Sequence, residues 1–218
     1  MRPWVRIVSA CTIDGRIASS TGFSRLSCEY DLKRLHMHRA ECDAVMIGAR
    51  TAEIDDPMLT VRLVPTKRQP IRVVVDGRLS CRTSLRLFRT AREIPTIVFT
   101  SERADPGKIR ELKDLGVNVE VVGHEKVDLK AALEILYSRY GVRKLLVEGG
   151  GNLNINLLRE GLVDEIYVTV TPYVFGSGVS IFNGDGYKDT SECPRFLLKD
   201  VVICECGNCV VLHYLIER

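Results

Sequence analysis

Glu148 is followed by three consecutive glycines, Gly149, Gly150 and Gly151, and this stretch is the part of the chain best suited to chemistry. An apolar run at residues 145–147 precedes it, and residues 152–160 are expected to form a helix. Glycine lacks a Cβ atom, so its backbone N–H groups can close on an anion, and the positive end of a helix dipole favours a phosphate. We therefore expect a cradle for a phosphorylated cofactor. The alternative is a tight strand-to-helix turn that needs glycine only for its dihedral angles.

The glycine run matches neither of the two common phosphate-binding motifs. No Lys followed by Ser or Thr comes after the glycines, which disfavours a Walker-type nucleoside triphosphatase. Asn154 stands where the third glycine of GxGxxG would be, and the run lies late in the chain, whereas a Rossmann motif usually opens the first βαβ unit. The cradle is therefore expected in another α/β fold.

Other polar segments also follow directly after expected strands. These segments are residues 12–16, 48–62, 76–78, 100–103 and 148–152. In a parallel α/β sheet, ligands lie beyond the carboxyl ends of the strands, so the segments are expected to gather at one edge as a single site. Asp14 has a competing interpretation as a turn residue whose side chain caps its own backbone.

The elements that must position these segments alternate between strands and helices. Apolar, β-branched runs predict strands at residues 4–11, 44–47, 71–75, 96–100, 117–122 and 165–170. Ser27, Asp105 and Asp128 are typical helix starts, and a short helix after residue 48 is expected to end before Pro57. Residues 201–206 and 209–216 predict a hairpin. The pattern predicts one α/β domain over residues 1–218, with a mostly parallel sheet between helices and an antiparallel C-terminal hairpin.

Size and charge narrow the class of protein. The chain has 218 residues, of which 45% are hydrophobic, enough for a well-buried core. Its net charge of +3 comes from 31 basic and 28 acidic residues without a long block of one sign, which gives nucleic-acid binding little support. No apolar run approaches the roughly 20 residues that span a bilayer, and no signal-peptide core is found. We expect a soluble cytoplasmic protein that needs no membrane.

The cysteines are expected to be mostly buried apolar residues, although one group invites a metal. Three of the eight cysteines, Cys204, Cys206 and Cys209, lie close together, with His213 just beyond. We interpret Gly207-Asn208 as a two-residue hairpin turn, which makes the flanking cysteines cross-strand neighbours. Because a flat hairpin rarely wraps a metal, no metal is predicted. An oxidisable pair of Cys206 and Cys209 stays open.

Taken together, the motifs resemble those of the riboflavin-biosynthesis pyrimidine reductases over nearly the whole chain. They are residues 12–16 (TIDGR), 38–40 (HRA), 43–44 (DA), 48–51 (GART), 55–62 (DDPMLTVR), 69–76 (QPIRVVVD) and 148–151 (EGGG). The resemblance implies a dihydrofolate reductase-like fold and NADPH as cofactor. It also implies reduction of a ribosylamino to a ribitylamino side chain on a 5′-phosphorylated diaminopyrimidine, and a homodimer.

The chain lacks the H-x-E and P-C-x-x-C zinc signature of the deaminase that is fused to many bacterial relatives. It therefore resembles the stand-alone reductase of archaeal and fungal type. That type acts on the still-aminated 2,5-diamino-6-(ribosylamino)pyrimidinone phosphate.

The resemblance also implies roles for individual residues. Combined with the positions after the strands, it gives these cofactor contacts: Thr51, Asp55, Asp76, Gly77, Thr100, Ser101, Gly149, Gly150, Gly151, Asn152, Leu153 and Asn154. The implied substrate contacts are Arg39, Leu59, Arg62 and Glu148. The two arginines suit a 5′-phosphate because a guanidinium offers a planar fork of donors, although each could instead form a surface ion pair.

Glu148, Arg16 and Asp14 are the expected catalytic residues. We interpret Glu148 as the group that handles a proton or anchors the pyrimidine amines. Many relatives have lysine at the position of Arg16, and an arginine cannot shuttle a proton, so Arg16 is expected to act by charge and orientation. Relatives often have serine at the position of Gly77.

The choice of cofactor and the alternative functions depend on further features of the sequence. Arg78, Ser101 and Arg103 are candidates for contact with the 2′-phosphate of NADPH. Dihydrofolate reduction is disfavoured because a folate site is rich in aromatic residues, and only 6% of this chain is aromatic. A nucleotide-binding module without turnover is the alternative that is not an enzyme.

Overall fold

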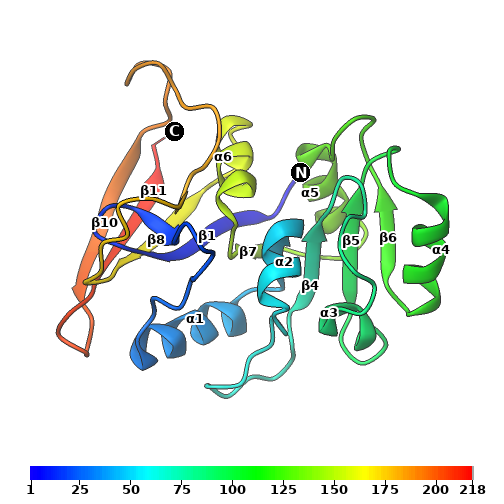
Figure 1. The fold of residues 1–218 in the computed structure, drawn as a ribbon, viewed down its shortest axis with the longest axis horizontal. Helices are drawn as coiled ribbons and strands as arrows, with labels where there is room; N and C mark the ends of the chain where they lie inside the picture. Colours follow the sequence, from blue (N-terminus) through cyan, green and yellow to red (C-terminus); the bar gives the residue numbers. More distant parts are fainter. Residues whose placement is uncertain (218) are drawn as a thin grey trace. The chain divides into compact units, whose positions relative to one another are not determined.

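The β-branched runs expected as strands are strands in the computed structural model, which describes residues 1–217 (Figure 1). The strands at residues 71–75, 96–100 and 165–170 have the predicted bounds. The chain divides into two compact units. The first unit contains Met1–Trp4 and His36–Leu146, and the second contains Val5–Leu35 and the chain from Val147 onward. Within residues 1–217, no helix has both the length and the apolar character needed to cross a membrane.

The first unit is built on parallel strands in the order β7-β3-β4-β5-β6. These strands are β3 (Ala44–Gly48), β4 (Ile71–Val75), β5 (Thr96–Thr100), β6 (Asn118–Val121) and β7 (Lys144–Val147). The helices between them are α2 (Ala49–Asp55), α3 (Arg86–Arg89), α4 (Pro106–Asp114) and α5 (Leu129–Ser138). The central strands are buried, which is the pattern expected for parallel strands covered on both faces.

Two helices of this unit begin where side-chain caps predict. The carboxylate of Asp105 accepts hydrogen bonds from the backbone N–H groups of Gly107 and Lys108, at 2.6 and 3.0 Å, and Pro106 follows as the first residue of α4. Asp128 accepts from the backbone N–H of Ala131 at 2.9 Å and caps α5. Such caps satisfy N–H groups that have no partner inside the helix, so the starts are encoded locally.

Arg72 is a fully buried charge in the middle of β4. Its guanidinium donates to the hydroxyls of Thr90 and Thr96 and to the carbonyls of Leu87 and Ile94, at 2.6–3.0 Å. Burial lowers the pKa of Arg72 to about 10, because the charged form loses its hydration. The neutral acceptors replace that hydration, so the arginine ties β4 to β5 and to the end of α3.

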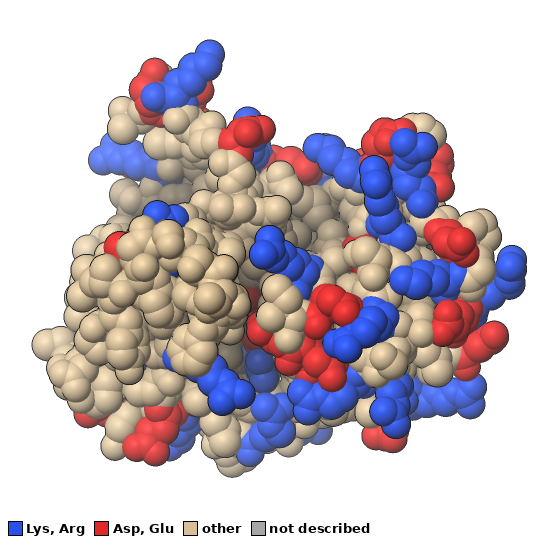
Figure 2. All heavy atoms as spheres, in the orientation of Figure 1, with Lys and Arg blue, Asp and Glu red and all other residues tan. Residues whose placement is uncertain are grey.

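The second unit combines a parallel strand pair with an antiparallel hairpin. β1 (Trp4–Cys11) lies parallel to β8 (Glu165–Val170), and β11 (Val210–Ile216) lies antiparallel between β8 and β10 (Phe196–Ile203). β2 (Arg16–Ala18) and β9 (Val179–Ser180) form a separate two-stranded sheet. The helix of this unit that matters for the site is α6 (Gly151–Arg159). The side of the molecule that carries β8, β10 and β11 is largely uncharged (Figure 2).

Two local predictions in this part of the chain are wrong. Helix α1 (Glu29–Glu41) begins after Cys28 rather than at Ser27, because the carbonyl of Cys28 accepts the N–H of Leu32 and its sulfur accepts the N–H of Asp31. The hairpin strand β10 ends at Ile203, before the predicted end at residue 206.

The hairpin turn is longer than a two-residue Gly207-Asn208 turn. Ile203 pairs with Val210, and the backbone N–H of Cys204 donates to the carbonyl of Cys209 at 2.8 Å. Gly207 adopts a positive φ of 75°, and its N–H donates to the carbonyl of Cys204. Cys209 is therefore opposite Cys204. A two-residue turn would have placed it opposite Cys206. All eight cysteines are free thiols.

Candidate active site

Glu148 and the glycines lie where strand β7 passes into helix α6. Glu148 is half-buried, Gly149 has a φ of +96°, and the Gly149–Gly150 peptide bond is cis. Gly150 is the N-cap residue of α6, and no side chain within residues 1–217 caps it. The cap residue therefore supplies no side-chain acceptor to the first backbone N–H groups of α6, which is an arrangement that an anion can complete.

Gly151 is needed for packing. A Cβ atom at this position would collide with the carbonyl oxygen of Ser180 and would lie 2.8 Å from the Cβ of Asn183. The backbone N–H of Asn183 also donates to the carbonyl of Gly151 at 3.1 Å. The chain around β9 therefore lies directly against the first turn of α6, which the sequence did not indicate.

Two asparagines of α6, Asn152 and Asn154, contact this same segment. Asn154 is fully buried, and its side-chain NH₂ donates to the carbonyl of Ile181 at 2.9 Å. Its Oδ1 atom is buried without a hydrogen-bond partner among the described residues. The Oδ1 of the exposed Asn152 accepts from the side chain of Asn183 at 2.6 Å, while Leu153 is buried as part of the core. Asn154 thus leaves an acceptor beside the glycines.

Asp14 joins two loops of the second unit. It accepts from the hydroxyl of Thr12 at 2.6 Å and from the backbone N–H groups of Phe175 and Gly176, at 3.1 and 2.9 Å. The hydrogen bond from Thr12, followed by those from Phe175 and Gly176, holds the pKa of Asp14 below its ordinary value although burial opposes this. Asp14 is therefore a carboxylate that holds the loop after β8 in place, rather than a residue that caps only its own turn.

Arg16 is held by the same parts of the chain. Its Nη1 donates to the hydroxyl of Ser180 at 2.6 Å, and its Nε lies 3.8 Å from Oδ2 of Asp14. The backbone N–H of Arg16 donates to the hydroxyl of Thr12. In the second unit the structure therefore brings Asp14, Arg16 and the start of α6 onto one segment, residues 175–183. The one signal of this segment in the sequence is its glycines, Gly176 and Gly178.

In the first unit, Asp76 organises the loop after β4. Its carboxylate accepts from the backbone N–H of Cys81 at 2.8 Å and from the hydroxyl of Ser80 at 3.1 Å. Burial alone raises the pKa of Asp76, but these donors from Cys81 and Ser80 together lower it below its ordinary value. Asp76 is thus buried as an anion that shapes the loop at Gly77.

Ser101 and Thr100 lie next to that loop, at the end of β5. The hydroxyl of Ser101 donates to the carbonyl of Gly77 at 2.6 Å. The hydroxyl of Thr100 is buried and has no hydrogen-bond partner among residues 1–217. Gly77 has an open environment, since a Cβ there would meet only ordinary van der Waals contacts. The loops after β4 and β5 therefore lie side by side at one edge of the sheet, as the sequence predicts.

Helix α2 carries two of the predicted cofactor contacts, Thr51 and Asp55. Thr51 is half-buried near the start of α2, and Asp55 is exposed at its last position. The next residue, Asp56, has a left-handed φ of 38° and accepts from the backbone N–H of Arg86 at 2.8 Å. The left-handed conformation ends the helix and turns the chain toward the segment that contains Leu59.

The three predicted substrate contacts outside Glu148 differ in exposure. Leu59 is buried with a φ of +51°, and such conformations of bulky residues are found where the surrounding structure enforces them. Arg39 is also buried and donates to the carbonyl of Thr60 at 2.9 Å. Arg62 is exposed, and its backbone N–H donates to Nδ1 of His36 at 2.8 Å. Arg39 therefore supports the loop from inside, while Arg62 presents its guanidinium at the surface.

The chain is similar to known proteins over most of its length. The family model of the RibD C-terminal domain matches residues 3–212. A 2,5-diamino-6-ribosylamino-4(3H)-pyrimidinone 5′-phosphate reductase from Methanothermobacter thermautotrophicus is 39% identical over 203 residues, which cover 91% of this chain and 92% of that protein.

Two solved structures are similar in fold. Acinetobacter baumannii RibD (form 2) superposes with a TM-score of 0.85 at 28% identity, and the match covers 99% of this chain and 58% of that longer chain. Enterococcus faecalis dihydrofolate reductase superposes with a TM-score of 0.57 at 12% identity, covering 99% and 97%. The predicted α/β class with a dihydrofolate reductase-like fold is confirmed. The chain belongs to the family of the RibD C-terminal domain.

Proposed function

We propose that this chain reduces the ribosylamino side chain of 2,5-diamino-6-ribosylamino-4(3H)-pyrimidinone 5′-phosphate to the ribitylamino product, with NADPH as the electron donor. The identity to the Methanothermobacter reductase extends over 91% of the chain, so the proposal concerns the whole fold and not one motif. The observation that carries it is the uncapped start of α6 directly after Glu148. A carboxylate beside an anion site suits a reaction that needs both a phosphorylated cofactor and a proton.

The residues present suit a cofactor with a pyrophosphate group. Backbone N–H groups at the start of α6, which no side chain of residues 1–217 caps, would hold the pyrophosphate. The buried Oδ1 of Asn154 has no hydrogen-bond partner among residues 1–217, so it would accept a hydrogen bond from a donor group of the cofactor. When bound, NADPH supplies the hydride. The other residues proposed to hold it are Thr51, Asp55, Gly77, Thr100, Ser101, Gly149, Gly150, Gly151, Asn152 and Leu153, while Asp76 acts through the loop at Gly77.

Asp76 has a positioning role in this proposal. Its carboxylate already accepts from Cys81 and Ser80, so it shapes the Gly77 loop instead of meeting the cofactor directly. Arg78 is exposed and Arg103 forms a 3.0 Å ion pair with Glu125 at the surface, so both guanidiniums are within reach of solvent. They are the groups proposed to favour the 2′-phosphate of NADPH over NADH.

Arg62 is proposed to bind the 5′-phosphate of the substrate. Its exposed guanidinium offers several donors and keeps its charge near neutral pH. Leu59 would pack against the base, and Arg39 would hold the intervening Thr60 carbonyl in place. The role of Arg39 is thus indirect, which modifies the direct phosphate contact expected from the sequence.

Glu148 is proposed as the group that gives or takes a proton at the sugar. Opening of the ribosylamine ring requires proton transfer to the ring oxygen or the nitrogen, and the carboxyl group of Glu148, half-buried at a strand end, would supply this proton in its acid form. Arg16 would orient the reacting sugar and stabilise charge on it, because a guanidinium cannot lose its proton at working pH. Asp14 holds Arg16 and the loop of residues 172–176.

A homodimer and a cytoplasmic location belong to the same proposal. β10 is the outermost strand of its sheet and exposes five apolar side chains, Leu197, Leu198, Val201, Val202 and Ile203. A second copy of the chain would cover this edge, which otherwise favours aggregation. Sedimentation of the wild type and of Val202→Lys tests this, with a dimer expected only for the wild type. The eight free thiols suit a reducing compartment.

The decisive test of the function is a substrate comparison. Loss of NADPH absorbance is followed with the diaminopyrimidinone phosphate, its deaminated form, dihydrofolate and a pterin. We expect turnover with the ribosylaminopyrimidine phosphates only, with a ribitylamino product identified by mass spectrometry. Turnover of dihydrofolate alone would assign a different reductase activity. Binding of NADPH without turnover of any compound would favour the nucleotide-binding module.

A further inference from the structure

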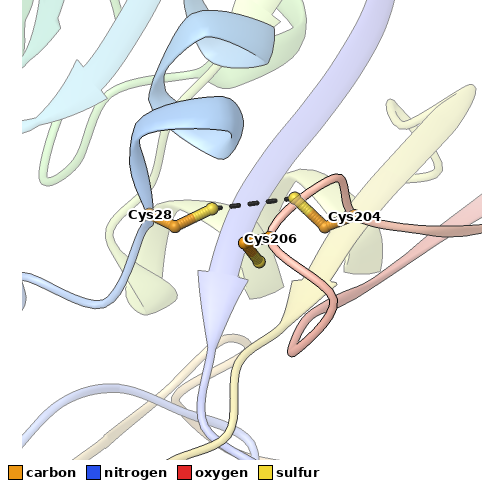
Figure 3. A group of neighbouring side chains, drawn as sticks. All are labelled: Cys28, Cys204 and Cys206. Atoms are coloured by element: carbon orange, nitrogen blue, oxygen red, sulfur yellow. Dashed lines mark hydrogen bonds between the residues drawn. The ribbon is translucent and has the colours of Figure 1, made fainter.

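Three cysteine sulfurs from two distant segments meet in the second unit. Cys28 lies just before α1, and Cys204 and Cys206 lie in the turn between β10 and β11 (Figure 3). Their Sγ atoms all lie within 4.8 Å of one another, and those of Cys28 and Cys204 are 3.6 Å apart. Among the described residues, this is the one group of three His, Cys, Asp or Glu side chains placed to share a metal ion.

A fourth thiol adjoins the three. Cys209 is buried and pairs with Cys204 through the backbone N–H of Cys204, at 2.8 Å from the carbonyl of Cys209. Its thiol interacts electrostatically with that of Cys206. Cys206, Gly207, Asn208 and Cys209 form a C-x-x-C turn, and Cys28 approaches it from outside the hairpin. Three sulfurs therefore lie within 4.8 Å of one another, and the thiol of Cys209 adjoins that of Cys206 outside this group.

The spacing of the sulfurs suits a tetrahedral metal site. With a Zn–S bond of about 2.3 Å, the sulfurs of a tetrahedral site are about 3.8 Å apart. A disulfide needs about 2.05 Å. The 3.6 Å between Cys28 and Cys204 is close to the first value and far from the second.

Hydrogen-bond donors lie beside three of the four sulfurs. The backbone N–H of Asp31 donates to the sulfur of Cys28 at 3.4 Å, and the backbone N–H of Asn208 donates to that of Cys206. Arg34 donates to the sulfur of Cys204 at 3.6 Å while it is paired with Asp31 at 2.9 Å. Four thiolates and one divalent ion carry a net charge of −2, which the guanidinium and the N–H donors offset in part.

We propose that Cys28, Cys204 and Cys206 bind one thiophilic divalent cation, Zn²⁺, as a structural site, and that the adjoining thiol of Cys209 turns toward the ion as its fourth ligand. A closed set of four thiolates leaves no position for a substrate, which is typical of structural zinc. The ion would join the start of α1 to the β10–β11 turn. The flat-hairpin argument against a metal fails, because one ligand comes from elsewhere in the chain. His213 is not a ligand, since its ring stacks on Tyr167 and its Nε2 contacts Glu165.

The test uses the full chain purified under reducing conditions after expression with added zinc. We expect one zinc per chain by elemental analysis, and replacement by Co²⁺ should give the intense absorption of tetrahedral cobalt thiolates. Cys28→Ser should weaken Co²⁺ binding by at least tenfold. Cys193→Ser is the matched control, because Cys193 is half-buried and its thiol donates to the carbonyl of Thr190, outside the cluster.

A second measurement keeps the proposal testable if Cys28→Ser folds poorly. In the wild-type protein, zinc should protect Cys28 and Cys206 from alkylation, and a chelator should remove that protection and lower the melting temperature. Absence of bound zinc or cobalt in the folded wild type would overturn the proposal. So would cobalt binding that Cys28→Ser leaves unchanged, or a disulfide within the cluster in the reduced preparation. The reductase assay is read separately and does not decide this point.

Discussion

Asp14 accepts a hydrogen bond from the backbone N–H of Gly176, at 2.9 Å, across 162 positions of the sequence. This contact, together with the one from Phe175, fastens the loop after β8 to the loop after β1. The same stretch of chain continues to Ser180, which holds Arg16, and to Ile181 and Asn183, which hold α6. One carboxylate thus anchors the segment against which the candidate catalytic groups are placed.

Asp14→Ala is expected to release residues 172–176 and to lower kcat/KM by about tenfold, with less effect on NADPH affinity. The loop should exchange its backbone amide protons faster, which hydrogen exchange detects. The pKa of Asp14 is lower in the folded than in the unfolded protein. The stabilisation by its contacts with Phe175 and Gly176 is therefore present above the unfolded pKa and is lost as pH falls through the folded pKa. Asp185→Asn, at a side chain that is 98% exposed, should leave both measurements unchanged.

Glu148→Gln is expected to lower kcat by about 100-fold, the usual scale of general acid–base catalysis, while NADPH still binds. The amide keeps the shape of the side chain and removes its proton transfer. Steady-state kinetics and a separate binding titration distinguish the two effects. Glu160→Gln, at the exposed end of α6, is the control. A variant at residue 148 with the wild-type rate would show that another group handles the proton.

Gly151→Ala is expected to weaken NADPH binding by about tenfold or more, equal to about 1.4 kcal/mol, because the new methyl group collides with the Ser180 carbonyl and displaces the start of α6. Calorimetric titration measures the affinity. Gly186→Ala is matched to it, since a Cβ there meets no atom within 4 Å. Equal affinities of the two variants would mean that α6 can shift without loss of the cofactor.

Arg62→Ala is expected to raise KM for the phosphorylated substrate by about tenfold or more, through loss of a charge-assisted contact worth about 1.5–3 kcal/mol. An analogue without the 5′-phosphate should show no difference between variant and wild type. Arg39→Ala should instead destabilise the fold by about 1–3 kcal/mol, because the buried carbonyl of Thr60 loses its donor. Urea unfolding measures this loss of stability. A stable Arg39→Ala variant with a high KM would mean that Arg39 contacts the substrate directly.

Asp43→Asn is expected to reduce the free energy of unfolding most near neutral pH. Oδ2 of Asp43 accepts from the N–H groups of Arg143 and Lys144, at 2.8 and 2.9 Å, and Oδ1 pairs with Arg68. Burial raises the pKa of Asp43, but these partners lower it more, so the folded pKa lies below the unfolded one. The stabilisation is present above about pH 4 and is lost as pH falls through the folded pKa.

Urea midpoints measured across this range should show the wild-type advantage shrink toward acid. Asp114→Asn changes an exposed carboxylate at the end of α4 and should show no such trend. An advantage that stayed constant down to low pH would mean that Asp43 acts through its shape and not through its charge.

The sequence by itself determined the strands of the first unit and the starts of α4 and α5. Burial on both faces demands apolar runs such as Val73-Val74, and Asp105 and Asp128 cap their helices through contacts only two or three residues away. These signals are local, so they are readable without coordinates. The motifs that indicated the family are local in the same sense.

Only the tertiary structure decided which distant residues meet. Nothing near residues 175–183 indicates that they lie on α6, and Cys28 carries no sign of Cys204, 176 positions away. It also decided that Arg39 is buried while Arg62 is exposed, although both are arginines in family motifs. The physical reason is that such contacts depend on chain topology and on loop conformations set by long-range packing, and a single sequence records those only through their net effect on stability.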